Sequence, residues 1–139
     1  MATSQAARLR TVTTGEAEVV AGLVNDGSAL VVAQAAVTEA VRLRAGIRFV
    51  QVLSPELDAD ARESADAVTF QAALTALRGH SRIRCTFEVV TGDPALVLAS
   101  RSHGSRALVL GEDRRESEAV VAAYCQQHAR CPVVTVPRS

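Results

Sequence analysis

Several residue types that mark particular kinds of protein are missing or scarce in this chain of 139 residues. There is no lysine, so the 15 basic residues are all arginines, which excludes a Schiff-base lysine and the lysine of a P-loop. Tryptophan is also absent, and one Tyr and three Phe supply no row of rings on which the bases of single-stranded nucleic acid could stack. These absences exclude chemistry that depends on a lysine and disfavour a protein that binds single-stranded nucleic acid by stacking.

An excess of charge is lacking as well, because 15 acidic residues balance the 15 basic ones and no run of arginines exceeds two. We therefore expect neither nucleic acid nor an anionic membrane surface as a partner. No apolar run approaches the roughly 18 residues of a membrane span, and the first residues lack the layout of a secretory signal. The sequence thus predicts a cytoplasmic protein without a membrane partner.

Residues that commonly carry chemistry are few and scattered. The three cysteines, Cys85, Cys125 and Cys131, form no C-x-x-C pair, which disfavours a disulfide framework or a zinc site. For Cys125 and Cys131 we expect core packing, and for the three histidines an ordinary placement, mostly near helix ends. No nucleophile elbow, H-E-x-x-H, G-x-G-x-x-G or Walker A sequence occurs. The sequence favours a binding or regulatory module over an enzyme.

What the chain does contain is 48% hydrophobic residues, enough for one core, arranged as short β-type runs that alternate with helical stretches. Residues 1–15 are expected to be a loose leader, and 16–139 one domain. The predicted strands cover 19–24, 47–53, 83–89, 107–110 and 133–136. The alternating pattern of the third strand and the prolines beside the fifth place these two at the edges of a parallel sheet. The predicted fold is α/β.

Four helices are predicted between these strands, each with an apolar stripe or a cap. Ser28 is expected to cap the first helix, and Asp93 followed by Pro94 to open the third, which ends near Ser102. The second helix is predicted over 61–78 and the fourth over 117–129. The side chains expected to form the inward stripe are Leu30, Ala33, Val37 and Val41 in the first helix and Ala67, Phe70, Leu74 and Leu77 in the second. In the fourth helix, Val120, Val121, Tyr124 and His128 are expected to face inward or half-inward.

The order of the elements and four segments together resemble the universal stress protein family over about residues 18–137. The segments are Asn25-Asp26-Gly27-Ser28, Gly92-Asp93-Pro94, Leu108-Val109-Leu110-Gly111 and Cys131-Pro132-Val133-Val134-Thr135-Val136-Pro137. The resemblance implies an open five-stranded parallel sheet of order 3-2-1-4-5 with helices on both faces. It also implies a nucleotide site at Asp26, which would face the ribose, at Val52, whose backbone would meet adenine, and at Gly111. The residues alone leave another reading of Asp26 open, in which its turn simply begins the first helix.

The phosphate-binding loop of the resembled family is largely missing here. That pattern is a glycine, two residues, a second glycine, nine residues, then glycine and Ser or Thr; only Gly111 remains, while Arg114, Ala119 and Val120 stand at later positions. Glu112, Asp113 and Glu116 would each repel a triphosphate by about a kcal/mol at intermediate dielectric. We therefore predict that no cofactor binds in the family manner.

The leading hypothesis is a dimeric module that acts by binding a protein partner. The resemblance implies a homodimer formed through the last strand, Val133, Val134, Thr135 and Val136, whose unpaired edge favours such pairing. The alternative is an adenine-nucleotide sensor that still holds ATP or AMP through Asp26, Val52 and Gly111. A hydrolase or transferase in the same cleft is the weakest reading, because no residue pair has the required donor and base.

Overall fold

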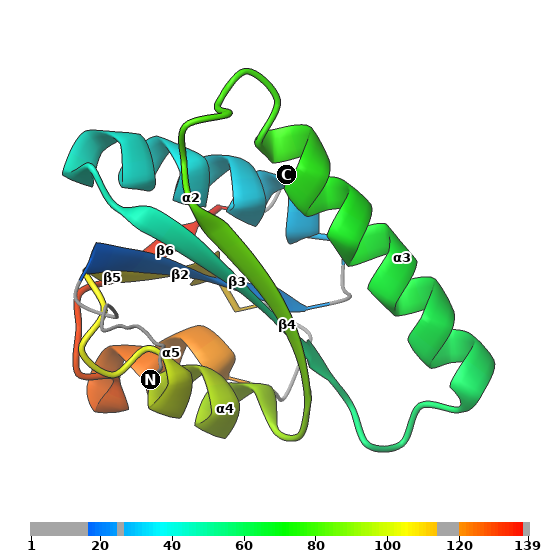
Figure 1. Cartoon of the computed structure of the whole chain (residues 1–139). Coiled ribbons are helices and arrows are strands. Elements are labelled where there is room, and N and C mark those ends of the chain that lie inside the picture. Colours follow the sequence, from blue (N-terminus) through cyan, green and yellow to red (C-terminus); the bar gives the residue numbers. More distant parts are fainter. Residues whose placement is uncertain (1–16, 25–26, 114–119, 138–139) are drawn as a thin grey trace, which may run out of the picture.

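The computed structural model describes residues 17–24, 27–113 and 120–137, and these form a parallel sheet covered by helices on both faces (Figure 1). The strands are β2 (Glu18–Val24), β3 (Gly46–Leu53), β4 (Cys85–Thr91), β5 (Ala107–Gly111) and β6 (Val133–Val136). The helices are α2 (Ala29–Leu43), α3 (Ala59–Ala76), α4 (Pro94–Arg101) and α5 (Val121–His128). The expected leader, residues 1–15, lies outside the described residues.

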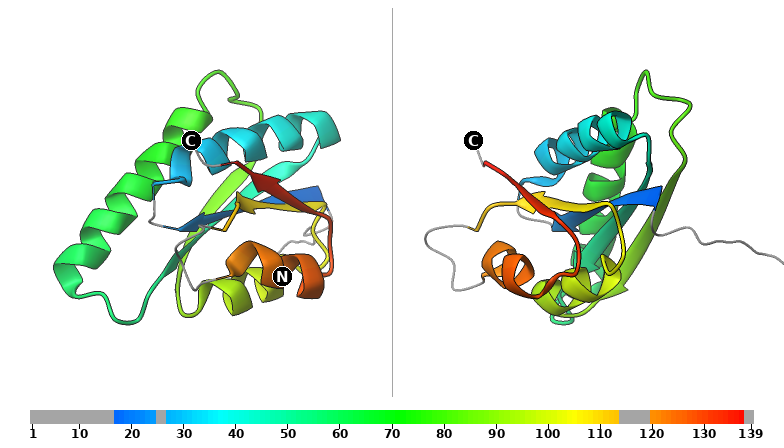
Figure 2. Two further views of the ribbon diagram at one scale, coloured as in Figure 1. Left: turned by 180° about the vertical axis from the view of Figure 1, so that it is seen from behind. Right: turned by 90° about the vertical axis from the view of Figure 1, so that its left-hand side faces the viewer.

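The strand order is β4-β3-β2-β5-β6 with every neighbouring pair parallel, which confirms the predicted order 3-2-1-4-5. The two strands predicted at the edges, β4 and β6, are the edge strands of the described sheet. β2 is central and almost wholly buried because helices cover both of its faces. Views from behind and from the side show α2 and α3 on one face and α4 and α5 on the other (Figure 2).

Alternation along the strands divides the core into two layers. Val19, Ala21 and Leu23 face α2, while Val20 belongs to the second layer, which contains Leu98 and Cys125. Gly22 faces this second layer, and a Cβ added there would lie 2.7 Å from Leu98 Cδ1. A side chain on this strand position would therefore push α4 away from the sheet.

The predicted inward stripe of α2 is partly wrong. Ala33 and Val37 are buried as expected, but Leu30 and Val41 are 40% and 52% exposed. The buried face also contains small side chains, and its other members are Ala29, Val32, Ala36 and Ala40. Because apolar residues occur almost all round this helix, their spacing does not single out one face. Packing selects the face that lets α2 approach the sheet most closely.

The predicted stripe of α3 is mostly wrong for a related reason. Phe70 and Leu74 are each 45% exposed, Ala67 is exposed and Leu77 is half-buried. The buried residues are small, namely Ala65, Thr69, Ala73 and Ala76. Phe70 packs by its edge on Phe87 of β4, with ring centroids 5.1 Å apart at 88°. The bulky side chains of α3 thus border the sheet edge, and the small ones lie against the sheet and α2.

The face predicted for the last helix is partly confirmed, because Val121 and Tyr124 are half-buried, but Val120 and His128 are exposed. The buried residues of α5 are Ala122 and Cys125. The largest boundary shift is at the start of this helix, which begins at Val121 and not at residue 117. β4 begins at Cys85 and not at Ile83. α4 matches its prediction closely, with Asp93 at its N-cap and Pro94 in its first turn.

Candidate functional site

Because all strands run in the same direction, the carboxyl ends of β2, β3 and β5 lie together on one side of the sheet, here called its carboxyl edge. β2 and β5 are the neighbours between which the strand order changes direction, since β3 and β4 lie to one side and β6 to the other. In open α/β sheets, ligands usually bind beside such a point. Of the three predicted site residues, Asp26 lies outside the described residues, and Val52 and Gly111 are both placed near this edge.

Gly111 ends β5 where that strand approaches the start of α2. A Cβ added at Gly111 would lie 3.3 Å from Ser28 Oγ and 3.4 Å from Ser28 Cβ, which is close but not prohibitive. Ser28 occupies the N-cap position of α2 and is buried, but its side chain makes no cap hydrogen bond, so its predicted capping role is wrong. The glycine has a packing explanation here that requires no ligand.

Val52 is buried in the second core layer. It stands opposite Val24 of β2 and Val90 of β4 in the two ladders that β3 makes. Its side chain therefore contributes to the hydrophobic core on the α4 and α5 side. A ligand would have to use its backbone, as the resemblance implies, and that role remains a prediction.

The N-terminus of α5 is held by a carboxylate from the end of β5. Asp113 Oδ1 accepts a hydrogen bond from the Ala122 N–H at 2.8 Å, and Asp113 Oδ2 accepts one from the Ala123 N–H at 3.1 Å. The N-cap residue itself is Val120, which has no side-chain acceptor and makes no cap bond. Free N–H groups and a positive helix dipole favour an anion at this position. Asp113 supplies that anion from within the chain.

The residue before Asp113 is fixed in a different way. The backbone N–H of Glu112 donates to the Val136 carbonyl at 3.0 Å, which continues the β5 and β6 ladder by one residue. A loop that cradles phosphate needs backbone N–H groups that converge on the anion. Here the N–H groups of Glu112, Ala122 and Ala123 already have partners within the protein. Arg114, Glu116 and Ala119 lie outside the described residues.

Cys125 lies in α5, and the pKa of its thiol depends on its burial and on the negative charges near it. Burial, together with the negative charges of Cys131 and Asp113, raises the pKa of the Cys125 thiol to about 11. The thiol is therefore neutral at physiological pH, and its sulfur lies 3.8 Å from the Ala95 carbonyl oxygen as a weak donor. Cys125 is fully buried and Cys131 packs against the same layer, which confirms the packing role expected for both.

Asp113 is the functional residue that sequence reasoning placed correctly but interpreted incompletely. The sequence predicts a carboxylate that opposes phosphate, and the structure adds that this carboxylate accepts hydrogen bonds from two N–H groups in the first turn of α5. No pattern in the sequence predicts this contact, because the sequence predicts the helix over 117–129, whereas it begins at Val121 and its N-cap, Val120, has no capping side chain. In the part of the chain that the structure describes, no three His, Cys, Asp or Glu residues are grouped so that they could hold a metal. None of the helices described combines the length and hydropathy needed to cross a membrane.

The sheet order, the two pairs of covering helices and the position of the candidate site define a universal stress protein-like α/β fold. No family model matches the sequence, and a search of curated proteins found no match. Comparison of structures therefore carries the assignment.

Three solved structures illustrate the similarity. A protein of the universal stress protein family from Burkholderia pseudomallei is 23% identical, with a TM-score of 0.64 over 91% of this chain and 99% of its own. A universal stress protein in complex with cAMP is 18% identical, with a TM-score of 0.68 over 88% of this chain and 98% of its own. A universal stress protein family protein from Arabidopsis thaliana with AMP bound is 17% identical, with a TM-score of 0.58 over 88% and 91% of the two chains. At these identities the comparison establishes the fold.

Proposed function

We propose that this chain is a regulatory binding module in which an internal carboxylate occupies the place where a nucleotide's phosphates would bind. In this proposal the module acts through a protein partner, has no catalytic role and works in the cytoplasm. The single observation that carries the proposal is the pair of hydrogen bonds from Ala122 and Ala123 to Asp113.

A phosphate group would have to displace Asp113 before it could use these N–H groups. Hydrogen bonds to a charged acceptor contribute about 1.5–3 kcal/mol, so displacement removes a substantial interaction. The displaced carboxylate would then lie close to the phosphate, and like charges at about 4 Å repel by about 4 kcal/mol at an effective dielectric constant of 20. Both effects oppose binding of ATP in particular, because its charge is the greatest among the adenine nucleotides.

A second candidate function is supported by the ligands of two structural neighbours. One is a complex with cAMP and another has AMP bound. An adenosine group could use Val52, Gly111 and Asp26 without reaching the N-terminus of α5. The chain would then be a sensor of adenosine or a nucleotide of low charge, with Asp113 excluding those that carry more phosphate.

Calorimetric titration with adenosine, AMP, cAMP and ATP distinguishes these functions. The binding module predicts no saturable heat from any of the four at ligand concentrations up to about 1 mM, a range that corresponds to about −4 kcal/mol of binding free energy. The sensor predicts saturation by adenosine, AMP or cAMP and weaker binding of ATP. Saturation by ATP with the highest affinity of the series would contradict both.

We also propose that two copies associate through β6. β6 has β5 as its neighbour on one side and ends the sheet on the other, and its four residues are half-buried. The β5 N–H groups of Leu108 and Glu112 donate to the carbonyls of Pro132 and Val136. Because backbone groups alternate along a strand, those of Val133 and Thr135 point away from β5. A second β6 strand could pair with this outer side.

Light scattering coupled to size exclusion tests the dimer with the variants Thr135→Pro and Thr135→Val. Proline removes the outward N–H without touching the N–H groups that face β5, whereas valine keeps the backbone donor and the branched shape. We expect dimers for the native chain and for Thr135→Val, and a folded monomer for Thr135→Pro. Monomers at about 100 μM native protein, ample for a specific interface, would contradict the proposal.

A further inference from the structure

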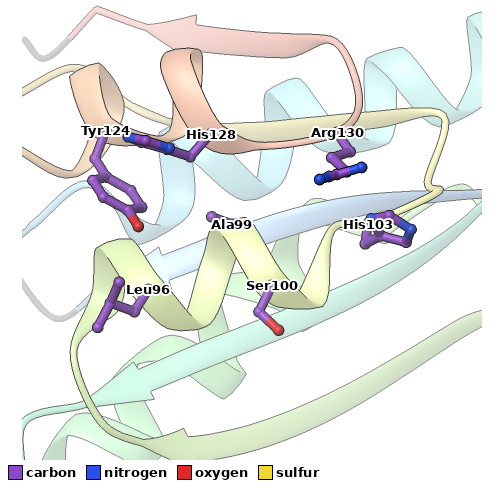
Figure 3. A pocket seen from close by; sticks show the side chains of 7 residues that line it. All are labelled: Leu96, Ala99, Ser100, His103, Tyr124, His128 and Arg130. Carbon is purple, nitrogen blue, oxygen red and sulfur yellow. The ribbon is translucent and has the colours of Figure 1, made fainter.

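A groove of about 480 Å³ runs between α4 and α5 on the outer side of these helices. Figure 3 shows Leu96 and Tyr124 toward one end and His103 and Arg130 toward the other, with His128 beside Tyr124. This volume falls within the range of small-molecule sites, about 300–1,000 Å³. None of these residues takes part in the site at the carboxyl edge of the sheet.

The end of the groove near Arg130 is rich in basic side chains and poor in acidic ones. Residues 94–110 and 120–137, which include both helices, contain three arginines and two histidines but no Asp or Glu. Arg101 is paired with Glu88 at 2.9 Å, outside the groove lining. Among the described residues, Arg130 and His103 have no ion pair and no side-chain hydrogen bond, and both are exposed. A guanidinium in this state can receive a carboxylate with two parallel hydrogen bonds.

The C-termini of α4 and α5 offer another explanation for these basic side chains, and it accounts for only part of their arrangement. His103 and Arg130 each follow the C-cap residue of a helix, where a partial negative charge of about half an electron favours a cation. That effect explains why basic residues stand there. It does not explain why the side chains of Arg130 and His103 line the same groove as an apolar and aromatic surface.

The other end of the groove supplies that surface. The rings of Tyr124 and His128 stack on each other, with centroids 4.2 Å apart and an angle of 31° between their planes, and this stacked pair, here called the Tyr124–His128 wall, is the aromatic side of the groove. Leu96, across the groove on α4, is 56% exposed and adds apolar surface to this end of the groove. An apolar or aromatic group placed between them would remove this surface from water and could stack on the rings.

We propose that the α4–α5 groove binds a small aromatic carboxylate. The aromatic ring of the ligand lies between Leu96 and the Tyr124–His128 wall, and its carboxylate accepts hydrogen bonds from the Arg130 guanidinium. His103 adds a donor at the same end. The site is independent of nucleotide binding, so the chain could respond to a ligand of this class even if no nucleotide binds at all.

The proposal is tested with 2-naphthoate and its uncharged counterpart 2-naphthamide, followed by ¹H–¹⁵N spectra of the full chain. We expect 2-naphthoate to move the amide signals of residues 96–104 and 122–130 and to bind about tenfold more tightly than the amide, since only the carboxylate can form charged hydrogen bonds. Arg130→Gln should weaken 2-naphthoate about tenfold and leave 2-naphthamide unchanged. Leu96→Ala should weaken both ligands, because both use the apolar end.

Arg82→Gln is the matched control, because Arg82 is an exposed arginine in the connection between α3 and β4 and lies outside the groove. It should bind 2-naphthoate as the native chain does. Thermal unfolding of each variant confirms that it is folded, which is expected for exchanges of exposed side chains. Equal binding of the acid and the amide, equal binding by Arg130→Gln, or no shift at about 10 mM 2-naphthoate would each overturn the proposal.

Discussion

α4 and α5 pack side by side on one face of the sheet, and each begins with two N–H groups bound to an aspartate. For α4 the acceptor is Asp93 Oδ1, which lies 2.9 Å from the Ala95 nitrogen and 3.4 Å from that of Leu96, and Asp93 is the residue directly before the helix. For α5 the acceptor is Asp113, which comes from the end of β5, nine residues before Ala122. The first is an ordinary local cap, and the second connects a strand to a separate helix.

The difference shows what a distant cap can do that a local cap cannot. Asp93 satisfies the start of its own helix and affects little else. Asp113 satisfies the start of α5 and positions the end of β5 relative to that helix. In the function proposed above it also places a negative charge where a nucleotide's phosphates would bind, so that one residue would link stability of the fold to the exclusion of anions.

Replacing each aspartate in turn should reveal this difference. We expect Asp113→Ala to lower the free energy of unfolding by about 2 kcal/mol, because it removes two charged hydrogen bonds and leaves the buried Ala122 N–H without a partner. Asp93→Ala should cost about 1 kcal/mol, as for a typical exposed cap. Urea denaturation followed by circular dichroism measures both. Asp113→Asn keeps one acceptor oxygen and should lie between the native chain and Asp113→Ala, and a larger loss for Asp93→Ala than for Asp113→Ala would contradict the comparison.

Gln51 offers a contrasting case, a buried polar group with no hydrogen-bond partner in the part of the chain that the structure describes. It is completely buried on β3, on the α2 side of the sheet, and neither its Oε1 nor its Nε2 has a hydrogen bond among the described residues. An unsatisfied buried amide costs about 1–3 kcal/mol, so Gln51→Met, which keeps length and approximate volume, should raise the free energy of unfolding by about 1–2 kcal/mol. The same denaturation experiment checks this prediction. A lower free energy of unfolding for Gln51→Met would contradict this prediction and indicate that the Gln51 amide stabilises the fold.

The burial of Cys125 should be detectable through the pH dependence of stability. The Cys125 pKa rises from 9.0 to about 11 chiefly through burial, so the folded state keeps a proton that the unfolded state releases between these values. Stability should therefore fall as pH rises from 9 to 11, with Cys125→Ser, which lacks a group titrating in this range, as the comparison.

At pH 8, iodoacetamide should modify the exposed Cys85 before the buried Cys125, as followed by mass spectrometry. Modification of Cys125 as fast as Cys85 in the folded chain would show that its burial is incomplete.

The parts of the fold that follow from local patterns could be predicted from the sequence. Buried runs such as Val19–Val24, the Gly92-Asp93-Pro94 helix start and the edge positions of β4 and β6 depend on residues close together in the chain. The inward faces of α2 and α3 could not be predicted reliably, because alanines occur on all sides of these helices and the side chains that pack best against the sheet are small. Leu30, Val41, Phe70 and Leu74 are exposed for this reason.

The candidate site was predictable only in its residue types. The sequence identifies Asp113 as an acid beside Gly111, but a hydrogen bond across nine or ten positions depends on how the intervening loop returns to the sheet. No pattern of spacing fixes that path. The nucleotide roles of Asp26, Val52 and Gly111 remain predictions, and Gly111 has gained a second explanation in its contact with Ser28.

The most direct measurement follows the amide signals of Ala122 and Ala123 in ¹H–¹⁵N spectra as ATP is added to the native chain and to Asp113→Ala. If Asp113 takes the place of a phosphate, these two signals stay unchanged in the native chain and move in Asp113→Ala, where the N–H groups have become free to bind an anion. Equally large movements in the native chain would mean that phosphate reaches α5 despite the carboxylate, and the account would be wrong.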